Sequence, residues 1–248
     1  MIASISMHLR RRLNARRFGV PFARRASFVV PKRIQLGAQF VPLALPPEHG
    51  AQSDFVTCFI NDDYGLSKTK GPVKTIADIG ANIGFFSMAA RSYFPNATIH
   101  AYEPNPRILQ YSTTNAACAE FTLFSEAVGR TTGLVSIVDC GDSNQARTSS
   151  AENRVASVPQ VVFSTVVRRL GGQIDLVKID CEGAEWELFA DEIPWLAVKR
   201  LRMEYHLSED RTYTDLECSL SRLGFQIHHH QPSGLFGTVW ARNIKVIA

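Results

Sequence analysis

The segment Asp78-Ile79-Gly80-Ala81-Asn82-Ile83-Gly84 joins a predicted strand to a predicted helix. The apolar run at 75–79 is typical of a buried strand, and residues 84–94 follow as a helix that Pro95 ends. Glycines in such a turn remove the Cβ penalty and let the backbone approach a ligand closely. The first N–H groups of the helix would face the same ligand. The segment therefore predicts a ligand site at the end of a strand.

Short strands and helices alternate beyond this segment, which is typical of a largely parallel sheet covered by helices on both faces. We expect strands at 75–79, 98–102, 121–125, 134–138, 174–179, 201–205, 225–229 and 235–241, and helices at 84–94, 107–118 and 184–190. A capping box, Thr214-x-x-Glu217, predicts one more helix, which Gly224 ends. Residues 141–158, rich in Ser, Asn and Gly, predict an irregular loop. The fold class is α/β and doubly wound.

Two acidic residues narrow the choice of ligand. Glu103 ends the second strand, nineteen residues after Gly84, where a carboxylate can accept hydrogen bonds from both hydroxyls of a ribose. Asp78 stands at the mouth of the turn, where its charge would repel a diphosphate but attract an ammonium group. Because S-adenosylmethionine (SAM) carries both an ammonium group and a ribose, we interpret the segment as a SAM site.

Other nucleotide sites fit the segment less well. A nicotinamide or flavin site is expected to read Gly-x-Gly-x-x-Gly, and a nucleoside triphosphate site needs Gly-Lys-Ser/Thr after the turn, which this sequence lacks. Two alternatives to a SAM-dependent enzyme stay open from the residues alone. One is a non-catalytic SAM-binding or scaffold domain, and the other is a dinucleotide-dependent oxidoreductase.

Five segments resemble the FkbM family of SAM-dependent methyltransferases in their order and spacing, over about residues 70–241. They are residues 76–87, 101–106, 126–129, 175–185 and 203–206. The resemblance implies a mostly parallel seven-stranded sheet with an antiparallel final strand. It also implies methylation of a hydroxyl group on a small molecule or a saccharide. Cys181 departs from the family pattern, in which valine is usual at this position.

The resemblance further implies which residues surround the cofactor. These are Asp78, Gly80, Asn82 and Gly84 at the methionine part of SAM, Glu103 and the adjoining Pro104 at the ribose, and Glu126 and Ala127 beside the adenine.

A second group of polar residues follows the next buried strand. Asp180 ends that strand at the carboxyl edge of the sheet, where ligands of open α/β folds bind, and Glu182 and Glu185 come soon after. Glu204 and His206 belong to the end of the neighbouring predicted strand. We expect Asp180, Glu182 and His206 to be catalytic, with His206 or Asp180 removing a proton from an acceptor hydroxyl.

A divalent cation held by some of these carboxylates and His206 is the alternative mechanism. No close spacing of metal ligands marks such a site, so we expect no metal. The histidine run at 228–230 is predicted to be packed or solvated. In a strand, His228 and His230 would share one face while His229 points away.

Charge is distributed unevenly along the chain. Residues 1–33 contain eight Arg, one Lys and no acid, so taking these nine charges from the net +4 leaves −5 for the rest. A mildly acidic body argues against a nucleic-acid-binding core. Residues 1–50 are predicted to form a solvated or loosely packed basic extension, although a transit peptide, or a helix that touches anionic lipid or a partner, stays open. Residues 51–248 would form the methyltransferase domain.

Cysteine usage and hydropathy bear on location. The five cysteines are odd in number and show no Cys-x-x-Cys spacing, which fits reduced thiols and a cytoplasmic protein. No apolar run approaches the roughly 18 residues that a membrane-spanning helix needs. The expected partner is a small-molecule or saccharide methyl acceptor.

Overall fold

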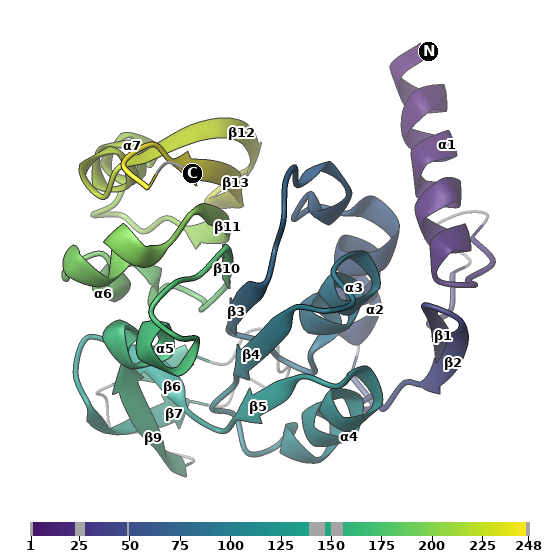
Figure 1. The fold of residues 1–248 in the computed structure, drawn as a ribbon, viewed down its shortest axis with the longest axis horizontal. Helices are drawn as coiled ribbons and strands as arrows, with labels where there is room; N and C mark the ends of the chain where they lie inside the picture. Colours follow the sequence, from purple (N-terminus) through teal and green to yellow (C-terminus); the bar gives the residue numbers. More distant parts are fainter. Residues whose placement is uncertain (1, 23–27, 49, 139–146, 150–155, 247–248) are drawn as a thin grey trace.

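The computed structural model describes residues 2–22, 28–48, 50–138, 147–149 and 156–246. At its centre lies a seven-stranded sheet in the order β12-β13-β11-β10-β3-β4-β5 (Figure 1). The strands are β3 Thr75–Ile79, β4 Thr98–Tyr102, β5 Thr122–Phe124, β10 Leu176–Ile179, β11 Arg200–His206, β12 Phe225–Ser233 and β13 Phe236–Asn243. Strands β3, β4, β5, β10 and β11 are parallel, and β13 lies antiparallel between β11 and β12. The predicted sheet is confirmed.

Successive residues of the strands point to opposite faces of the sheet and fill two separate cores. Ile76 packs on the first face, while Ala77 and Ile79 pack on the second. The helices are α3 Phe85–Tyr93 and α4 Leu109–Ala119 on the first face, and α5 Phe163–Arg169, α6 Glu185–Leu188, η5 Ile193–Ala197 and α7 Tyr213–Arg222 on the second. Helices on both faces make the fold doubly wound, as predicted.

The strand order reverses between β3 and β10. From β3 the chain passes through β4 to β5 on one side, and it later returns to β10 and β11 on the other side. Asp78 lies opposite Lys178, and Ile79 opposite Ile179, so the two strands end at the same level. Ligands of open α/β sheets bind outside the carboxyl ends of the strands at such a point. The residues that follow β3 and β10 are therefore brought side by side.

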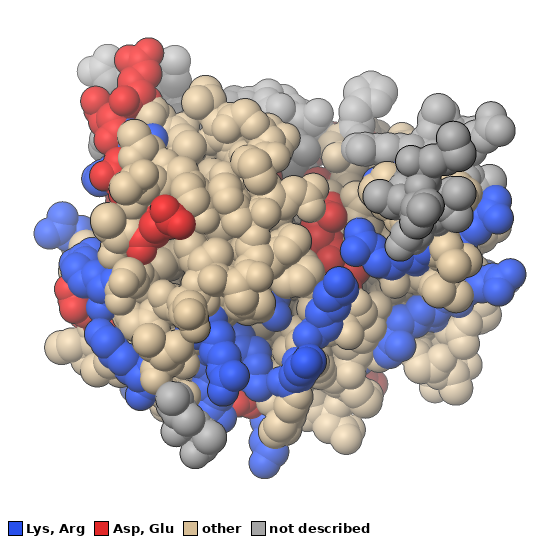
Figure 2. All heavy atoms as spheres, turned by 90° about the horizontal axis from the view of Figure 1, so that it is seen from above, with Lys and Arg blue, Asp and Glu red and all other residues tan. Residues whose placement is uncertain are grey.

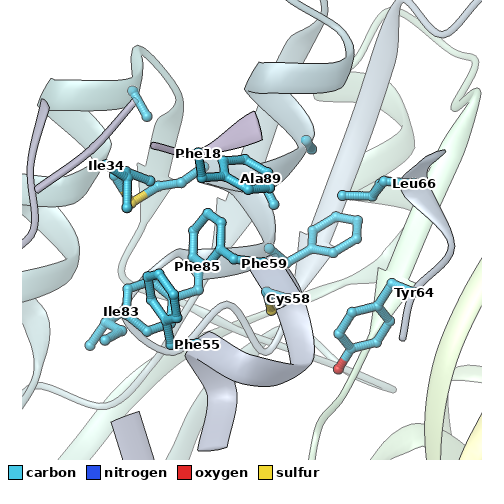
Figure 3. Close-up of a cluster of buried hydrophobic side chains, with 14 of the residues drawn as sticks. Phe18, Ile34, Phe55, Cys58, Phe59, Tyr64, Leu66, Ile83, Phe85 and Ala89 are labelled. Atoms are coloured by element: carbon cyan, nitrogen blue, oxygen red, sulfur yellow. The ribbon is translucent and has the colours of Figure 1, made fainter. Parts of the chain in front are cut away.

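The basic N-terminal region packs against the first face of the sheet. Its elements are α1 Ile2–Arg17, β1 Arg33–Leu36, β2 Gln39–Pro42, α2 Gly50–Phe55, η2 Val56–Asn61 and η3 Leu66–Lys68. The rings of Phe18, Phe55 and Phe59 form one cluster with Phe85 of α3 (Figure 3). Phe18 is 1% exposed and Ile34 is 0% exposed. The expectation of a solvated or loosely packed extension is wrong for residues such as Phe18 and Ile34, because these apolar side chains complete the core, whereas most described side chains of α1 are exposed or half-buried.

A second, four-stranded sheet has the order β6-β9-β7-β8, and only one of its strands, 134–138, was predicted. The strands are β6 Ala127–Gly129, β7 Gly133–Val138, β8 Arg147–Ser149 and β9 Ala156–Val162. The predicted loop at 141–158 is wrong at 147–149 and 156–158, which are strands, and its other residues lie outside the described part of the chain. Pro159 within β9 obscures the strand pattern, because proline is rare inside a sheet.

Helix α7 begins earlier than predicted. The Asp215 N–H donates to Thr212 Oγ1 at 3.3 Å, and the Thr212 N–H donates to Asp215 Oδ2 at 2.8 Å. The capping box is therefore formed by Thr212 and Asp215 rather than by Thr214 and Glu217. An N-cap residue needs an extended backbone, and Thr212 has one, whereas Thr214 already lies inside the helix.

Candidate active site

A cavity of about 870 Å³ lies at the carboxyl ends of β3, β4, β10 and β11. The turns after these strands, the β12–β13 hairpin, and α2 with η2 of the N-terminal region contribute its walls. The predicted site residues that line it are Gly80, Asn82, Glu103, Pro104, Glu126, Ala127, Asp180, Glu182 and His206. The other two, Asp78 and Gly84, are not part of its walls. One cavity thus joins both predicted groups of residues.

Gly80 is required by the turn after β3. Its φ is +75°, and a Cβ added here would lie 1.7 Å from the carbonyl oxygen of Asp180. No other residue fits unless the end of β10 moves. The N–H groups of Gly80 and Ala81 both donate to the carbonyl oxygen of Tyr102 at the end of β4. These contacts hold the ends of three strands together beside the cavity.

Gly84 has a packing role. It precedes α3 with a φ of +86°, and a Cβ added here would lie 2.5 Å from the ring of Phe121. Its neighbours Ile83 and Phe85 line the cavity, but Gly84 itself does not. Gly84 therefore shapes the turn, and its contact with the methionine part of SAM stays a prediction.

Asp78 is turned into the interior. It is 0% exposed, it accepts a hydrogen bond of 2.7 Å from Ser87 Oγ, and its Oδ1 lies 3.4 Å from Lys178 Nζ. The two side chains come from facing positions of β3 and β10 and point to the same side of the sheet. The prediction that Asp78 attracts an ammonium group at the mouth of the turn is wrong, because Lys178 already compensates its charge.

A different carboxylate, Asp54 of α2, lines the cavity beside the turn. Its Oδ2 accepts a hydrogen bond of 3.0 Å from Asn82 Nδ2. Asn82 has a positive φ of 49°, which an asparagine tolerates better than most residues, and this conformation turns it toward Asp54. The negative charge that we expected from Asp78 is thus supplied to the cavity by Asp54.

Glu103 lies at the end of β4 and is 8% exposed. Its Oε2 accepts a hydrogen bond from the Asn82 N–H and its Oε1 accepts one from the Asn105 N–H, each of 2.8 Å. Burial raises the pKa of Glu103 to about 7, although these N–H groups oppose the shift. Each carboxylate oxygen can accept a further hydrogen bond. Glu103, with the adjoining Pro104 in the cavity wall, can therefore bind a diol.

Glu126 and Ala127 border the cavity where the second sheet begins. Arg169 of α5 holds the Glu126 carboxylate with two hydrogen bonds of 2.5 and 3.2 Å. The Arg169 guanidinium also lies 4.3 Å from the centre of the Phe124 ring. Ala127 and the buried Val128 place apolar groups in the cavity wall beside the ion-paired Glu126, which suits a flat heterocycle.

Asp180 follows β10 and takes part in two polar contacts. Its Oδ2 accepts a hydrogen bond of 2.8 Å from the Tyr64 hydroxyl and lies 3.6 Å from Lys178 Nζ. Lys178 is 3% exposed and donates a hydrogen bond of 2.5 Å to the Gly80 carbonyl. Burial opposes its charged form, but Asp78 and Asp180 raise the pKa of Lys178. Lys178 therefore stays protonated between two carboxylates and fixes the position of Asp180.

His206 is the last residue of β11 and lies among several carboxylates. Its Nδ1 lies 3.0 Å from Oε1 of the fully buried Glu185, and its Nε2 lies 3.5 Å from Glu182 and 3.8 Å from Glu204. Burial lowers the pKa of His206, but the hydrogen bond to Glu185 and the charges nearby raise it to about 9. Burial and the charge of Asp180 raise the pKa of Glu204 to about 8. Glu185 thus holds the imidazole ring with Nε2 available to the cavity.

Asp180, Glu182 and His206 also form a set of possible metal ligands. One ligand atom from each lies within 4.8 Å of the others. The histidine run does not form a second such set. His229 stacks on Trp240 with ring centres 3.8 Å apart, and His230 stacks on Tyr213 at 3.9 Å. A β-bulge between Ile227 and His229 breaks the expected alternation of faces.

Some residues of the cavity were not predicted from the sequence, and two of these contact predicted site residues. Tyr64 and Asp54 come from the region just before the first strand of the sheet, and neither lies in a recognisable motif. Their contacts with Asp180 and Asn82 span 116 and 28 positions of the sequence. The one signal in the sequence is the run of aromatic residues at 55–64, which indicates that the preceding segment is packed against the domain.

The family model described as "Methyltransferase FkbM domain" matches residues 78–227. No curated protein matches the chain. The fibrillarin pre-rRNA processing protein of Methanococcus jannaschii is 12% identical, with 90% of this chain and 85% of that chain covered and a TM-score of 0.47. Precorrin-6y C5,15-methyltransferase of Geobacter metallireducens is 15% identical, with 73% and 85% covered and a TM-score of 0.46.

Proposed function

The chain belongs to the FkbM methyltransferase family, and from that premise we propose that it transfers a methyl group from SAM to a hydroxyl oxygen of a small molecule or saccharide. The observation that carries this proposal is the placement of Glu103 and His206 in one cavity, on either side of the point where the strand order reverses. Glu103 can bind a ribose, and His206 can accept a proton. A nucleotide-like cofactor and an acceptor would therefore meet between them.

The residues of the cavity fit SAM. Glu103 offers two carboxylate oxygens to the ribose hydroxyls. Gly80 lines the cavity with backbone alone, because the carbonyl oxygen of Asp180 occupies the place of a Cβ. Asp54 offers a negative charge to the ammonium group, and the wall of Ala127 and Val128 suits the adenine. When bound, SAM supplies an activated methyl group on a sulfonium centre.

The part of the cavity beyond Asp180 suits a hydroxyl-bearing acceptor. Gln231 and Ser233 of β12 and Thr238 of β13 line it with groups that both donate and accept hydrogen bonds. Such groups match the hydroxyls of a saccharide or a polyol better than they match an apolar surface. We infer that the acceptor lies against this hairpin with one hydroxyl turned toward His206.

His206 is the better general base of the two residues considered. Asp180 already accepts a hydrogen bond from Tyr64 and lies near Lys178, so its Oδ2 is engaged in contacts within the protein. His206 has its Nδ1 fixed by Glu185 and, in its neutral form, can take a proton on Nε2. Asp180 would orient the acceptor hydroxyl, and the carboxylate of Glu182 would stabilise the imidazolium that forms.

The proposal is tested by release of S-adenosylhomocysteine from SAM with a panel of sugars and other alcohols, and by mass spectrometry of the methylated acceptor. We expect His206→Gln to bind SAM normally and lose turnover by about two orders of magnitude or more. His228→Gln is the matched control and keeps full turnover. Equal turnover of both variants would refute the assignment of the base, and SAM binding without any turnover would favour a non-catalytic domain.

The same assay distinguishes catalysis by His206 as a general base from a metal-dependent mechanism. If His206 acts as a base, dialysis against EDTA leaves the turnover unchanged. If Asp180, Glu182 and His206 instead hold a cation that acidifies the acceptor, EDTA abolishes turnover and Mg²⁺ or Mn²⁺ restores it.

A further inference from the structure

Helix α1 presents two leucines to the outside of the molecule. Leu9 is 58% exposed and Leu13 is 56% exposed, and their spacing of four residues stacks them on one side of the helix. The packed side contains Ala15 and is followed by Phe18, each 1% exposed. Figure 1 shows α1 standing at the edge of the molecule, away from the sheet. The leucines are therefore not needed for the core that the rest of this region completes.

Arginines flank the two leucines. Arg10, Arg12 and Arg16 are exposed, and at about 100° per residue they fall on both sides of the leucine pair around the helix axis. No acidic residue occurs before Glu48 in the sequence. Figure 2 shows that Lys and Arg also gather in a band across one face of the protein. We propose that this outward face of α1, which we call the Leu9/Leu13 face, docks on the surface of an anionic lipid bilayer.

The arrangement favours a bilayer surface over other partners. Apolar side chains at the centre of the face can enter the boundary between headgroups and acyl chains, while arginines beside them reach anionic headgroups. A nucleic acid would use the arginines but would leave both leucines in water, and the rest of the chain carries a net charge of −5. No helix in the described part of the chain is long and apolar enough to cross a membrane.

The Leu9/Leu13 face is separate from the cavity. Arg11 lines the cavity, and its Nε donates a hydrogen bond of 2.8 Å to Asn61 Oδ1. Arg11 is about 200° around the helix from Leu9 and from Leu13. Substitutions of the two leucines therefore leave the cavity and the activity in solution unchanged.

Vesicle co-sedimentation of the full chain tests the proposal. The probes are vesicles of phosphatidylcholine alone and of phosphatidylcholine mixed with phosphatidylglycerol. We expect binding to the mixed vesicles only, weakened by salt, and reduced about tenfold or more in the double variant Leu9→Ser/Leu13→Ser. The double variant Ile193→Ser/Leu196→Ser is the control, because these exposed residues lie on η5. Unchanged binding of S-adenosylhomocysteine verifies that both variants fold.

Four results would overturn the proposal. The first is no binding of the wild type to the mixed vesicles. The second is equal loss of binding in the two double variants. The third is a self-associating wild type that becomes monomeric in Leu9→Ser/Leu13→Ser, since the leucines would then serve a second copy of the chain rather than lipid. Duplex DNA that competes fully with the mixed vesicles and binds the leucine variant normally would also assign the face to nucleic acid.

Discussion

The hydroxyl of Tyr64 donates a hydrogen bond of 2.8 Å to Oδ2 of Asp180. Tyr64 is 3% exposed, and its ring packs edge to face with the ring of Phe86, with the two ring centres 5.3 Å apart. Burial and the charge of Asp180 raise the pKa of Tyr64 well above its ordinary value, so the hydroxyl stays a donor. A residue of the N-terminal region therefore fixes the orientation of an acid at the centre of the candidate site.

Tyr64→Phe removes this donor and keeps the aromatic packing. We expect kcat/KM to fall about tenfold or more, because a hydrogen bond to a charged group contributes about 1.5–3 kcal/mol. The Kd for SAM should not change. The control is Tyr111→Phe, a half-buried tyrosine at the edge of the same core. Equal kcat/KM values for the two variants would show that Tyr64 has only a packing role.

Glu103→Gln is expected to weaken SAM binding by about ten- to a hundredfold, because it replaces a charged acceptor of two ribose hydroxyls. Since burial raises the pKa of Glu103 to about 7, the carboxylate becomes charged as the pH rises through 7. Calorimetry should therefore give a Kd for SAM that decreases over this range in the wild type but not in the variant. The exposed Glu209→Gln is the control, and a wild-type Kd independent of pH would argue against a ribose on Glu103.

The pH profile of kcat/KM tests His206 as the base. With a pKa raised to about 9, His206 is protonated at neutral pH, so kcat/KM should rise with pH until about 9. Glu185→Gln removes the charge that holds the proton, and the rising limb should move toward the ordinary value of 6.5. The same raised pKa stabilises the fold below pH 6.5, and this contribution is lost as the pH rises through about 9. If the rising limb of kcat/KM stays at the same pH in Glu185→Gln, the pairing of His206 with Glu185 is contradicted.

Substitutions of Asp78 and Asp54 are expected to have opposite effects, the first on the stability of the fold and the second on SAM binding. Asp78→Ala leaves Lys178 with one carboxylate fewer in the interior, and we expect the free energy of unfolding in urea to fall by about 3 kcal/mol. Asp54→Asn should change this free energy little but weaken SAM binding about tenfold, because Asp54 lines the cavity. The reverse pattern would restore Asp78 as the residue that contacts the cofactor.

The sheet could be predicted because its strands are short apolar runs whose periodicity depends on local sequence. Glu103 and His206 could be placed for the same reason, since each ends a recognisable strand and parallel strands end at one edge. The orientation of Asp78 could not be predicted. It depends on Lys178, which lies 100 positions away and meets Asp78 only through the register of β3 and β10.

The N-terminal region was misjudged for a related reason. Its charge is obvious in the sequence, whereas its apolar residues, such as Phe18 and Ile34, are spread out and reach the core singly. Tyr64 was missed because its partner Asp180 is distant in the sequence. Side chains that depend on one long-range contact carry no local pattern.

Calorimetric titration of the purified chain with S-adenosylhomocysteine and, separately, with NAD tests the cofactor assignment most directly. We predict saturable binding of S-adenosylhomocysteine to one site, lost in Glu103→Ala, and no heat with NAD. Binding of NAD, or no heat with either S-adenosylhomocysteine or SAM, would contradict the assignment of the cavity between Glu103 and His206.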